Sequence, residues 1–169
     1  KFWREREKEL VDKLHIQATT DQLTGIFNRR VVFDALDEAM ENANESQDRE
    51  FTTIMFDIDF FKQVNDTYGH AGGDAVLISF AKLLESEITS PNIVGRIGGE
   101  EFLAILYLNQ DQAAEFCKKL IIKINDNTVN FDGIDIKISS SGGVAFSSET
   151  NTSADLTNKA DERLYEAKK

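Results

Sequence analysis

Arg96-Ile97-Gly98-Gly99-Glu100-Glu101-Phe102 is the stretch from which the fold of this chain can be worked out, because apolar runs flank it on both sides. Val94 precedes it and Phe102–Leu106 ends it, which predicts a β-hairpin with the two glycines in its turn. Glycine leaves the turn backbone bare, so a ligand can approach it closely. Two adjacent carboxylates at a hairpin tip repel each other, and a bound divalent cation would replace this repulsion with attraction to the ion. The alternative is a solvated acidic hairpin.

The segments on either side of the hairpin predict a strand, helix, strand, strand, helix, strand order. Alternating apolar residues predict a first strand at Phe51–Ile58 and a last one that runs from Ile134 to Phe146. Helical spacing predicts helices from Asp74 to Ile88 and from Asp111 to Asp126. This order is that of a ferredoxin-like α+β fold, in which the first and third strands lie side by side.

That topology brings two acidic stretches together. A crossover helix makes the second strand parallel to the first, so the hairpin turn lies at the end of the sheet where the first strand ends. Asp57 should therefore face Glu100, beside the glycine-rich loop expected at Tyr68–Gly73. Converging carboxylates of this kind predict a Mg²⁺ site for a nucleotide. By analogy alone, the arrangement is similar to polymerase palms and nucleotide cyclases.

The segments that flank this core are predicted to be helical. Lys1–Gln17 carries a thin apolar stripe, and it could be the end of a coiled-coil linker or a simple amphipathic lead-in. Thr19-Thr20-Asp21 has the composition of a capping cluster, and Asn28 is expected to cap a helix that lasts to about Asn44. A last helix should open at Ser153 or Asp155.

Composition narrows the class of protein. A length of 169 residues fits one domain with a real core, and a net charge of −11 argues against a nucleic-acid surface. The one cysteine, Cys117, excludes an intramolecular disulfide and fits a reducing compartment, hence a cytoplasmic protein. The sequence shows no membrane span and no signal peptide. Because it starts without a methionine, we expect a larger parent protein, which other segments could anchor to a membrane.

Four motifs in order resemble those of GGDEF-domain diguanylate cyclases, here with Glu in place of Asp in the hairpin signature. Besides the hairpin Gly98–Phe102, the motifs are Asp21–Arg30, Asp57–Lys62, Asn65–Asp74 and Ala160–Lys168. The resemblance covers nearly everything from residue 21 onward. It implies a GGDEF catalytic domain at 21–169, with a ferredoxin-like βαββαβ core, extra helices and a small β-hairpin. Residues 1–20 would be a linker or signalling helix.

The resemblance implies a metal site and catalytic residues. Asp57, Glu100 and the carbonyl oxygen of Ile58 would bind Mg²⁺, with Mn²⁺ as an alternative ion. Either Glu100 or Glu101 would ease removal of the proton from the attacking 3′-hydroxyl, with Glu100 preferred. Lys62 would bring positive charge to the phosphates.

The resemblance also implies the residues that bind the substrate. Asn65 and Asp74 would read guanine, because a carboxylate can accept hydrogen bonds from guanine N1–H and the exocyclic amine. The remaining expected contacts are the backbone amides of Phe60 and Phe61 at a helix start and the bare turn at Gly98 and Gly99. Lys168 would bind phosphate, and His70 would be a neighbour of the substrate. Asp74 is also expected to cap the following helix.

The implied activity is condensation of two GTP into cyclic di-GMP with release of two pyrophosphates, in a homodimer whose sites face each other. An upstream sensor domain is the expected partner in the parent protein. The alternatives are a domain that binds GTP without turnover and regulates a neighbour, and a cyclase that makes cyclic GMP. Many members of the family bind product at an Arg-x-x-Asp motif before the hairpin, but Thr89-Ser90-Pro91-Asn92 stands there in this chain.

Overall fold

The computed structural model describes all 169 residues. The helices are α1 (Phe2–Thr19), α2 (Arg29–Glu45), α3 (Phe61–Glu87), α4 (Gln110–Asp126) and α5 (Ser153–Ala167). The strands are β1 (Thr52–Ile58), β2 (Ile93–Gly98), β3 (Glu101–Leu106), β4 (Thr128–Phe131), β5 (Ile134–Lys137) and β6 (Ser140–Phe146). Short 3-10 helices lie at Gln47–Arg49 and Ser147–Glu149. The order is the predicted α+β order, with additional helices at both ends and a small hairpin of β4 and β5.

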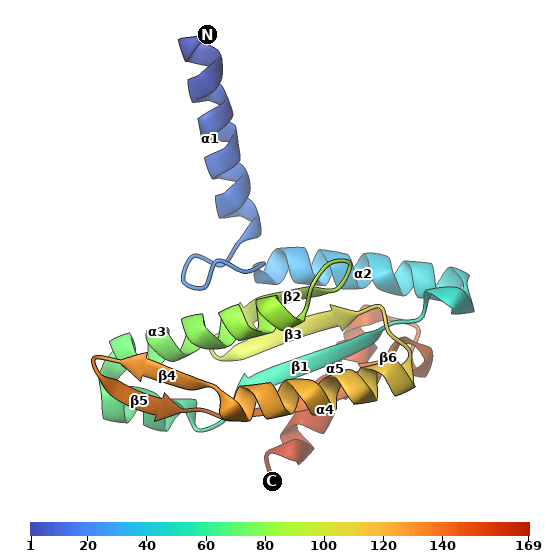
Figure 1. Ribbon diagram of the computed structural model, residues 1–169. Coiled ribbons are helices and arrows are strands. Elements are labelled where there is room, and N and C mark those ends of the chain that lie inside the picture. Colours follow the sequence, from blue (N-terminus) through green and yellow to red (C-terminus); the bar gives the residue numbers. More distant parts are fainter.

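A four-stranded sheet in the order β2-β3-β1-β6 forms the centre of the molecule (Figure 1). β1 pairs antiparallel with β3, from Thr52 opposite Leu106 to Asp57 opposite Glu101. β3 also pairs antiparallel with β2, so β2 runs parallel to β1. The predicted adjacency of the first and third strands is therefore confirmed, and the β2–β3 turn lies at the C-terminal end of β1.

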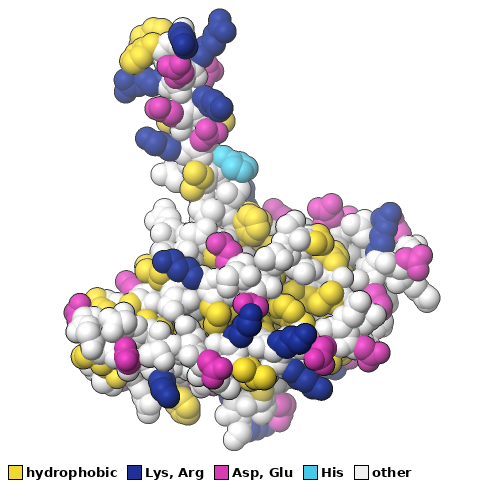
Figure 2. Space-filling model, viewed as in Figure 1, with side chains coloured by type: hydrophobic (Ala, Val, Ile, Leu, Met, Phe, Trp, Pro, Cys, Tyr) yellow, Lys and Arg dark blue, Asp and Glu magenta, His cyan; other side chains and the backbone are white.

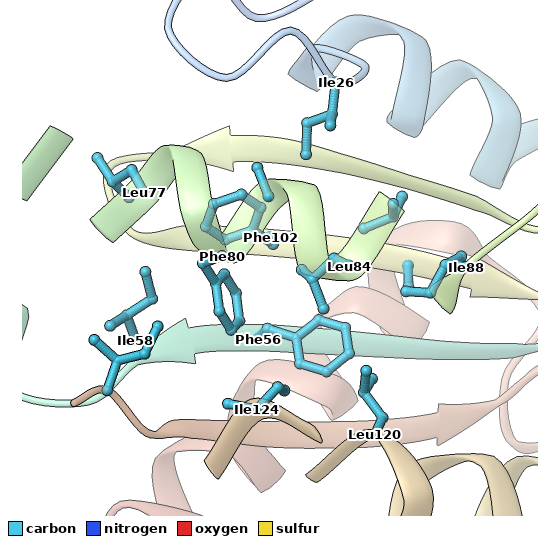
Figure 3. Packing of buried hydrophobic residues seen from close by; sticks show 14 of the residues in the cluster. Ile26, Phe56, Ile58, Leu77, Phe80, Leu84, Ile88, Phe102, Leu120 and Ile124 are labelled. Atoms are coloured by element: carbon cyan, nitrogen blue, oxygen red, sulfur yellow. The ribbon is translucent and has the colours of Figure 1, made fainter. Parts of the chain in front are cut away.

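Alternation along the strands divides the core into two layers. Ile54, Phe56 and Ile58 of β1 face α3 and α4, where Phe80 packs edge-on against the Phe102 ring with centroids 5.0 Å apart (Figure 3). Met55 of β1 faces the opposite way, into a second cluster with α2 and α5. Both faces of the sheet are thus covered by helices, and burial of these side chains is the main source of stability.

α3 differs from the prediction of a short turn, a glycine-rich loop and a new helix. The span Phe61–Glu87 consists of two helical segments that meet at a kink at Gly69, whose φ of 74° and ψ of 176° are not helical. A break between two helical segments was thus predicted correctly, but it is confined to Gly69 instead of a loop over Tyr68–Gly73, and Asp74 lies inside the second segment instead of capping it. Glycine fits here because the left-handed φ at the kink has no penalty without a Cβ. Gly72 and Gly73 are buried within the helix.

Two further boundaries differ from the sequence-based expectation, and two agree with it. Thr20 ends α1, and Asp21 lies in the connection to α2, so the Thr19–Asp21 cluster does not start a helix. The expected continuous strand from Ile134 to Phe146 is two strands, because β5 pairs with β4 whereas β6 joins the main sheet. α5 begins at Ser153, as predicted, and Thr152 caps it by accepting a hydrogen bond from the backbone N–H of Asp155. Asn28 caps α2 as predicted.

α1 extends away from the folded body, with no buried residue (Figure 1). Its apolar stripe is uncovered: Trp3 is 79% exposed and Leu10 59%. Side chains of both charge signs surround this stripe along the helix (Figure 2). None of the helices, α1 included, has the length and apolar character that crossing a membrane requires.

Candidate functional site

The carboxylates predicted to meet at the end of the sheet do lie on adjoining backbone. Asp57, near the end of β1, is the register partner of Glu101 at the start of β3. The next residue, Ile58, donates its backbone N–H to the carbonyl oxygen of Glu100 at 3.3 Å. The position of this acidic group therefore follows from strand pairing, and it does not depend on flexible side chains.

The Gly98-Gly99 turn presents open backbone beside these acids. Gly99 has a φ of +36°, and a Cβ built on either glycine would meet no heavy atom within 4 Å. The turn is braced from one side, because Arg96 Nε donates to the Gly99 carbonyl oxygen at 2.8 Å and Arg29 donates to that of Ile97 at 3.0 Å. A rigid turn with free space around it can accept a ligand close to its backbone.

Asp57 is a buried carboxylate, only 8% exposed. Lys168 Nζ of α5 lies 2.8 Å from Asp57 Oδ1, so an ammonium group lies directly against this carboxylate. Burial raises the pKa of Asp57 first of all, the Lys168 ammonium opposes this, and the charges of Glu100 and Asp59 add to the rise. A buried carboxylate in a cluster of negative charge suits a cation.

Glu101 belongs to the same electrostatic group. Burial raises the pKa of its carboxyl, and the negative charges of Asp57, Asp161 and Glu100 raise it further. No three acidic, histidine or cysteine side chains in the structure already form a metal-binding cluster. A magnesium ion would therefore be held by the two carboxylates of Asp57 and Glu100, completed by the Ile58 carbonyl oxygen and by atoms of a substrate or water.

Ser139, just before β6, and Ser141, within it, hold a third acid in place, and the sequence analysis missed them. Ser139 Oγ donates to Asp59 Oδ2 at 2.8 Å, and Ser141 Oγ donates to Asp59 Oδ1 at 2.6 Å. Ser140 Oγ donates to the carbonyl oxygen of Asp57 at 2.9 Å. These contacts fix the turn between β1 and α3. The serine run 139–141 was the available sequence signal, but its partner lies about 80 residues away.

The N-terminal end of α3 follows directly. Phe60 takes a left-handed backbone with φ 55° and its side chain is 74% exposed, which is a strained conformation for a bulky residue. This turn starts α3 at Phe61, so its first amides, which have no intrahelical acceptors, lie next to the acids. Such an end binds phosphate. Lys62, in the first turn, is exposed.

The predicted guanine-binding residues lie further along α3. Asn65 Oδ1 occupies the space that a Cβ on Gly73 would need. The absence of a side chain at Gly73 therefore allows the Asn65 amide to pack against the helical segment that follows the kink. Asn65 is half-buried, and Asp74, next to Gly73, is exposed. His70, just past the kink, is exposed as well. The kink at Gly69 thus brings two turns of one helix together around the amide.

Asp21 and Arg96 form a link that the sequence analysis did not identify. Arg96 lies 3.2 Å from Asp21 Oδ2, and the Arg96 backbone N–H donates to the Phe27 carbonyl oxygen at 3.0 Å. Burial alone would raise the pKa of Asp21, but hydrogen bonds from Thr24 and Arg96 outweigh it and lower the pKa. The connection between α1 and α2 is thereby tied to the hairpin that carries Glu100.

The sequence profile described as "Diguanylate cyclase, GGDEF domain" matches residues 18–169. Diguanylate cyclase A of Treponema denticola is 35% identical over 154 residues, which cover 89% of this chain and 42% of that protein. Diguanylate cyclase DgcS of Shewanella oneidensis is 35% identical over 92% of this chain and 51% of its own length. The chain thus spans about half, or less, of the curated relatives it matches.

Solved structures agree with this match. The coiled coil and GGDEF domain of DgcB from Caulobacter crescentus, in complex with c-di-GMP, superimposes with a TM-score of 0.87 at 28% identity, covering 97% of this chain and 87% of that one. Diguanylate cyclase SiaD of Pseudomonas aeruginosa, in complex with its activator SiaC, gives a TM-score of 0.85 at 32% identity, covering 98% and 64%. From its motifs, its fold and these matches, the chain belongs to the diguanylate cyclase GGDEF-domain family.

Proposed function

We propose that this chain is an active diguanylate cyclase domain, which condenses two GTP into cyclic di-GMP and releases two pyrophosphates. The observation that carries the proposal is the meeting of Asp57 with Glu100 at the sheet end, directly beside the free amides at the start of α3. Asp57 is buried there among the negative charges of Glu100 and Asp59, which suits a divalent cation better than an empty site.

Asp57, Glu100 and the Ile58 carbonyl oxygen would hold Mg²⁺, or Mn²⁺ in its place. The ion would offset the negative charge that accumulates on the triphosphate. The first amides of α3, at Phe60 and Phe61, would bind phosphate oxygens, and Lys62 would add positive charge there. The bare Gly98-Gly99 turn leaves room for the nucleotide.

Asn65 and Asp74 would orient the base. The Asp74 carboxylate accepts from guanine N1–H and the exocyclic amine, whereas adenine offers no N1 donor. The half-buried amide of Asn65 would contact the base edge, with His70 as a neighbour. This pair favours GTP over ATP.

In the reaction, the 3′-oxygen of one nucleotide attacks the α-phosphorus of the other, and the bond to pyrophosphate breaks. The 3′-hydroxyl must lose its proton, and a carboxylate with a raised pKa accepts it more readily. Glu101 is the adjacent carboxylate that the metal would leave free, and burial raises its pKa. Glu100 would be engaged with the metal, so we assign the proton acceptor to Glu101 in preference to Glu100.

Each domain holds one GTP, so two copies must meet with their sites facing. Residues 1–20 would serve as the linker helix that brings the copies together, and 21–169 as the catalytic domain. An upstream sensor domain would control this helix, which fits relatives that are about twice as long or longer. The domain would act in the cytoplasm, where GTP is available.

The test is incubation of the chain at high concentration with GTP and Mg²⁺, with the product identified by mass. Cyclic di-GMP is the expected product. If the Asp57→Asn variant makes none, the reaction takes place at this site. Bound but unconverted GTP would establish the regulatory alternative, and cyclic GMP would establish a single-chain cyclase. Either result would overturn the proposal.

A further inference from the structure

Lys168 occupies a place in the site that phosphate binding alone does not explain. Its ammonium lies 2.8 Å from Asp57 Oδ1, although its side chain is 35% exposed and could extend into solvent. Its backbone is fixed at the end of α5 by a hydrogen bond from its N–H to the carbonyl oxygen of Leu164 at 3.2 Å. The side chain therefore bends over the buried acid from a fixed anchor.

The other basic side chains of this region have different partners. Arg163 pairs with Glu149, and the neighbouring Lys169 pairs with Glu166. Among the charged groups that act on the pKa of Asp57, Lys168 is the one cation. It therefore offsets much of the repulsion that Asp57 experiences from the neighbouring acids.

We propose that Lys168 is a removable counter-ion of the metal site, which occupies the Asp57 carboxylate until a divalent cation arrives together with a nucleotide. This inference rests on the proposed function, because it takes Asp57 as the metal ligand. An ammonium and a divalent cation cannot both lie against the same buried oxygen, since like charges at that distance repel strongly. A metal ion that binds Asp57 Oδ1 must therefore displace Lys168.

Displacement alone has a cost, because the ammonium loses its only close carboxylate partner. When the cation brings a triphosphate with it, the released lysine finds new negative charge within reach of its anchor on α5. Lys168 would thus oppose binding of the bare metal and favour binding of metal and nucleotide together. In thermodynamic terms it supplies a coupling free energy between the two ligands.

The test measures Mn²⁺ binding to the whole chain by calorimetry or by electron paramagnetic resonance, without and with a non-hydrolysable GTP analogue. Lys168→Met removes the charge and keeps most of the side-chain bulk. Lys169→Met is the matched control, because its pair with Glu166 is exposed. Lys168→Arg keeps the charge, and the melting temperature of each metal-free variant checks that it folds.

Without nucleotide, Lys168→Met should bind Mn²⁺ about tenfold more tightly, since one neighbouring charge changes the cation affinity of a carboxylate by roughly that factor. The increase in Mn²⁺ affinity caused by the GTP analogue should shrink in this variant. Lys169→Met and Lys168→Arg should stay within about twofold of the unaltered chain. Unchanged or weaker Mn²⁺ binding by folded Lys168→Met would overturn the inference.

This outcome is separable from the proposed function. If the unaltered chain makes cyclic di-GMP while Lys168→Met leaves Mn²⁺ affinity unchanged, the activity stands and the counter-ion role is wrong. If Lys168→Met tightens Mn²⁺ binding but GTP is never converted, the counter-ion role stands and the cyclase activity is wrong.

Discussion

The backbone N–H of Ile58 donates to the carbonyl oxygen of Glu100 at 3.3 Å, so the end of β1 and the tip of the β2–β3 hairpin are joined by the main chain itself. Main-chain pairing fixes the distance between the two acidic stretches more firmly than two flexible side chains could. Any change that keeps the sheet intact should therefore keep this geometry, and side-chain substitutions at the site can be interpreted chemically.

Asp57→Asn should abolish turnover and metal-dependent GTP binding without lowering stability. Burial raises the pKa of Asp57, so the ionised form is disfavoured in the folded state, and at neutral pH this charge costs stability. A neutral amide removes that cost and also loses the pair with Lys168, so we expect a melting temperature equal to or above that of the unaltered chain.

Product formation and thermal unfolding should be measured together for this variant. Asp132→Asn is the matched control, because Asp132 lies exposed in the left-handed turn between β4 and β5, where asparagine is well tolerated. It should keep full activity. Wild-type turnover by Asp57→Asn would show that the metal assignment is wrong.

Much of the sheet could be predicted from the sequence, because the order of elements and the alternation in 51–58 leave few topologies for the acidic hairpin. That the break in α3 is confined to Gly69 could not be predicted, because glycines at 69, 72 and 73 look like a loop locally. Tertiary packing instead uses two of them for close contacts inside a helix. The Lys168–Asp57 pair could not be predicted either, because partners 111 residues apart leave no local pattern in the sequence.

Asp74→Ala should weaken GTP binding by at least about tenfold and reduce the preference of the site for GTP over ATP. A hydrogen bond to a charged group contributes roughly 1.5–3 kcal/mol, which corresponds to at least that factor. Because Asp74 lies inside α3, its loss should not uncap a helix. Glu85→Ala, at an exposed position of the same helix, is the control and should change neither affinity. An equal loss for GTP and ATP would contradict guanine recognition.

The Glu149–Arg163 pair should make stability depend on pH. Two hydrogen bonds from Arg163, at 2.6 and 2.7 Å, are the largest cause that lowers the pKa of Glu149 from 4.5 to about 2. A lowered folded-state pKa means that this stabilisation is complete above pH 4.5 and is lost as the pH falls towards 2. Arg163 is 41% exposed, so solvent screening limits the contribution to about 1–2 kcal/mol.

Glu149→Gln should therefore lower the free energy of unfolding by about 1–2 kcal/mol at pH 7, measured with urea. The difference from the unaltered chain should narrow as the pH falls to about 3. Glu166→Gln, which breaks an exposed pair with Lys169, should have little effect at either pH. A difference that stays constant with pH would mean that the ion pair does not contribute.

Activity should rise more steeply than linearly with protein concentration, because no single domain contains both reacting nucleotides. α1 carries an uncovered apolar stripe outside the folded body, with Trp3 and Leu10 exposed. This stripe is too narrow to hold two copies together tightly. Fusing a strong parallel coiled coil ahead of Lys1 should raise the specific activity. A rate per molecule that does not change on dilution, in a chain shown to be monomeric, would contradict the two-copy mechanism.

The last prediction concerns product inhibition at residues 89–92, just before β2. The family resemblance implies an Arg-x-x-Asp motif there in many members, but this chain has Thr89 and Asn92 at the charged positions. Threonine cannot pair bidentately with a guanine edge or a phosphate. Asn92 is already engaged, because its Oδ1 accepts the backbone N–H of Tyr107 at 2.9 Å and its own N–H donates to the Thr89 carbonyl oxygen at 3.0 Å.

We therefore expect cyclic di-GMP to inhibit only weakly and in competition with GTP. Thr89→Arg combined with Asn92→Asp restores both charged groups, and an aspartate can still accept the Tyr107 N–H. The double variant should acquire noncompetitive inhibition and bind cyclic di-GMP at least about tenfold more tightly, since an arginine–guanine or arginine–phosphate pair adds a charge-assisted bond of roughly 1.5–3 kcal/mol. Tight noncompetitive inhibition of the unaltered chain, lost on substitution around Thr89, would show that uncharged residues suffice for product binding at this surface.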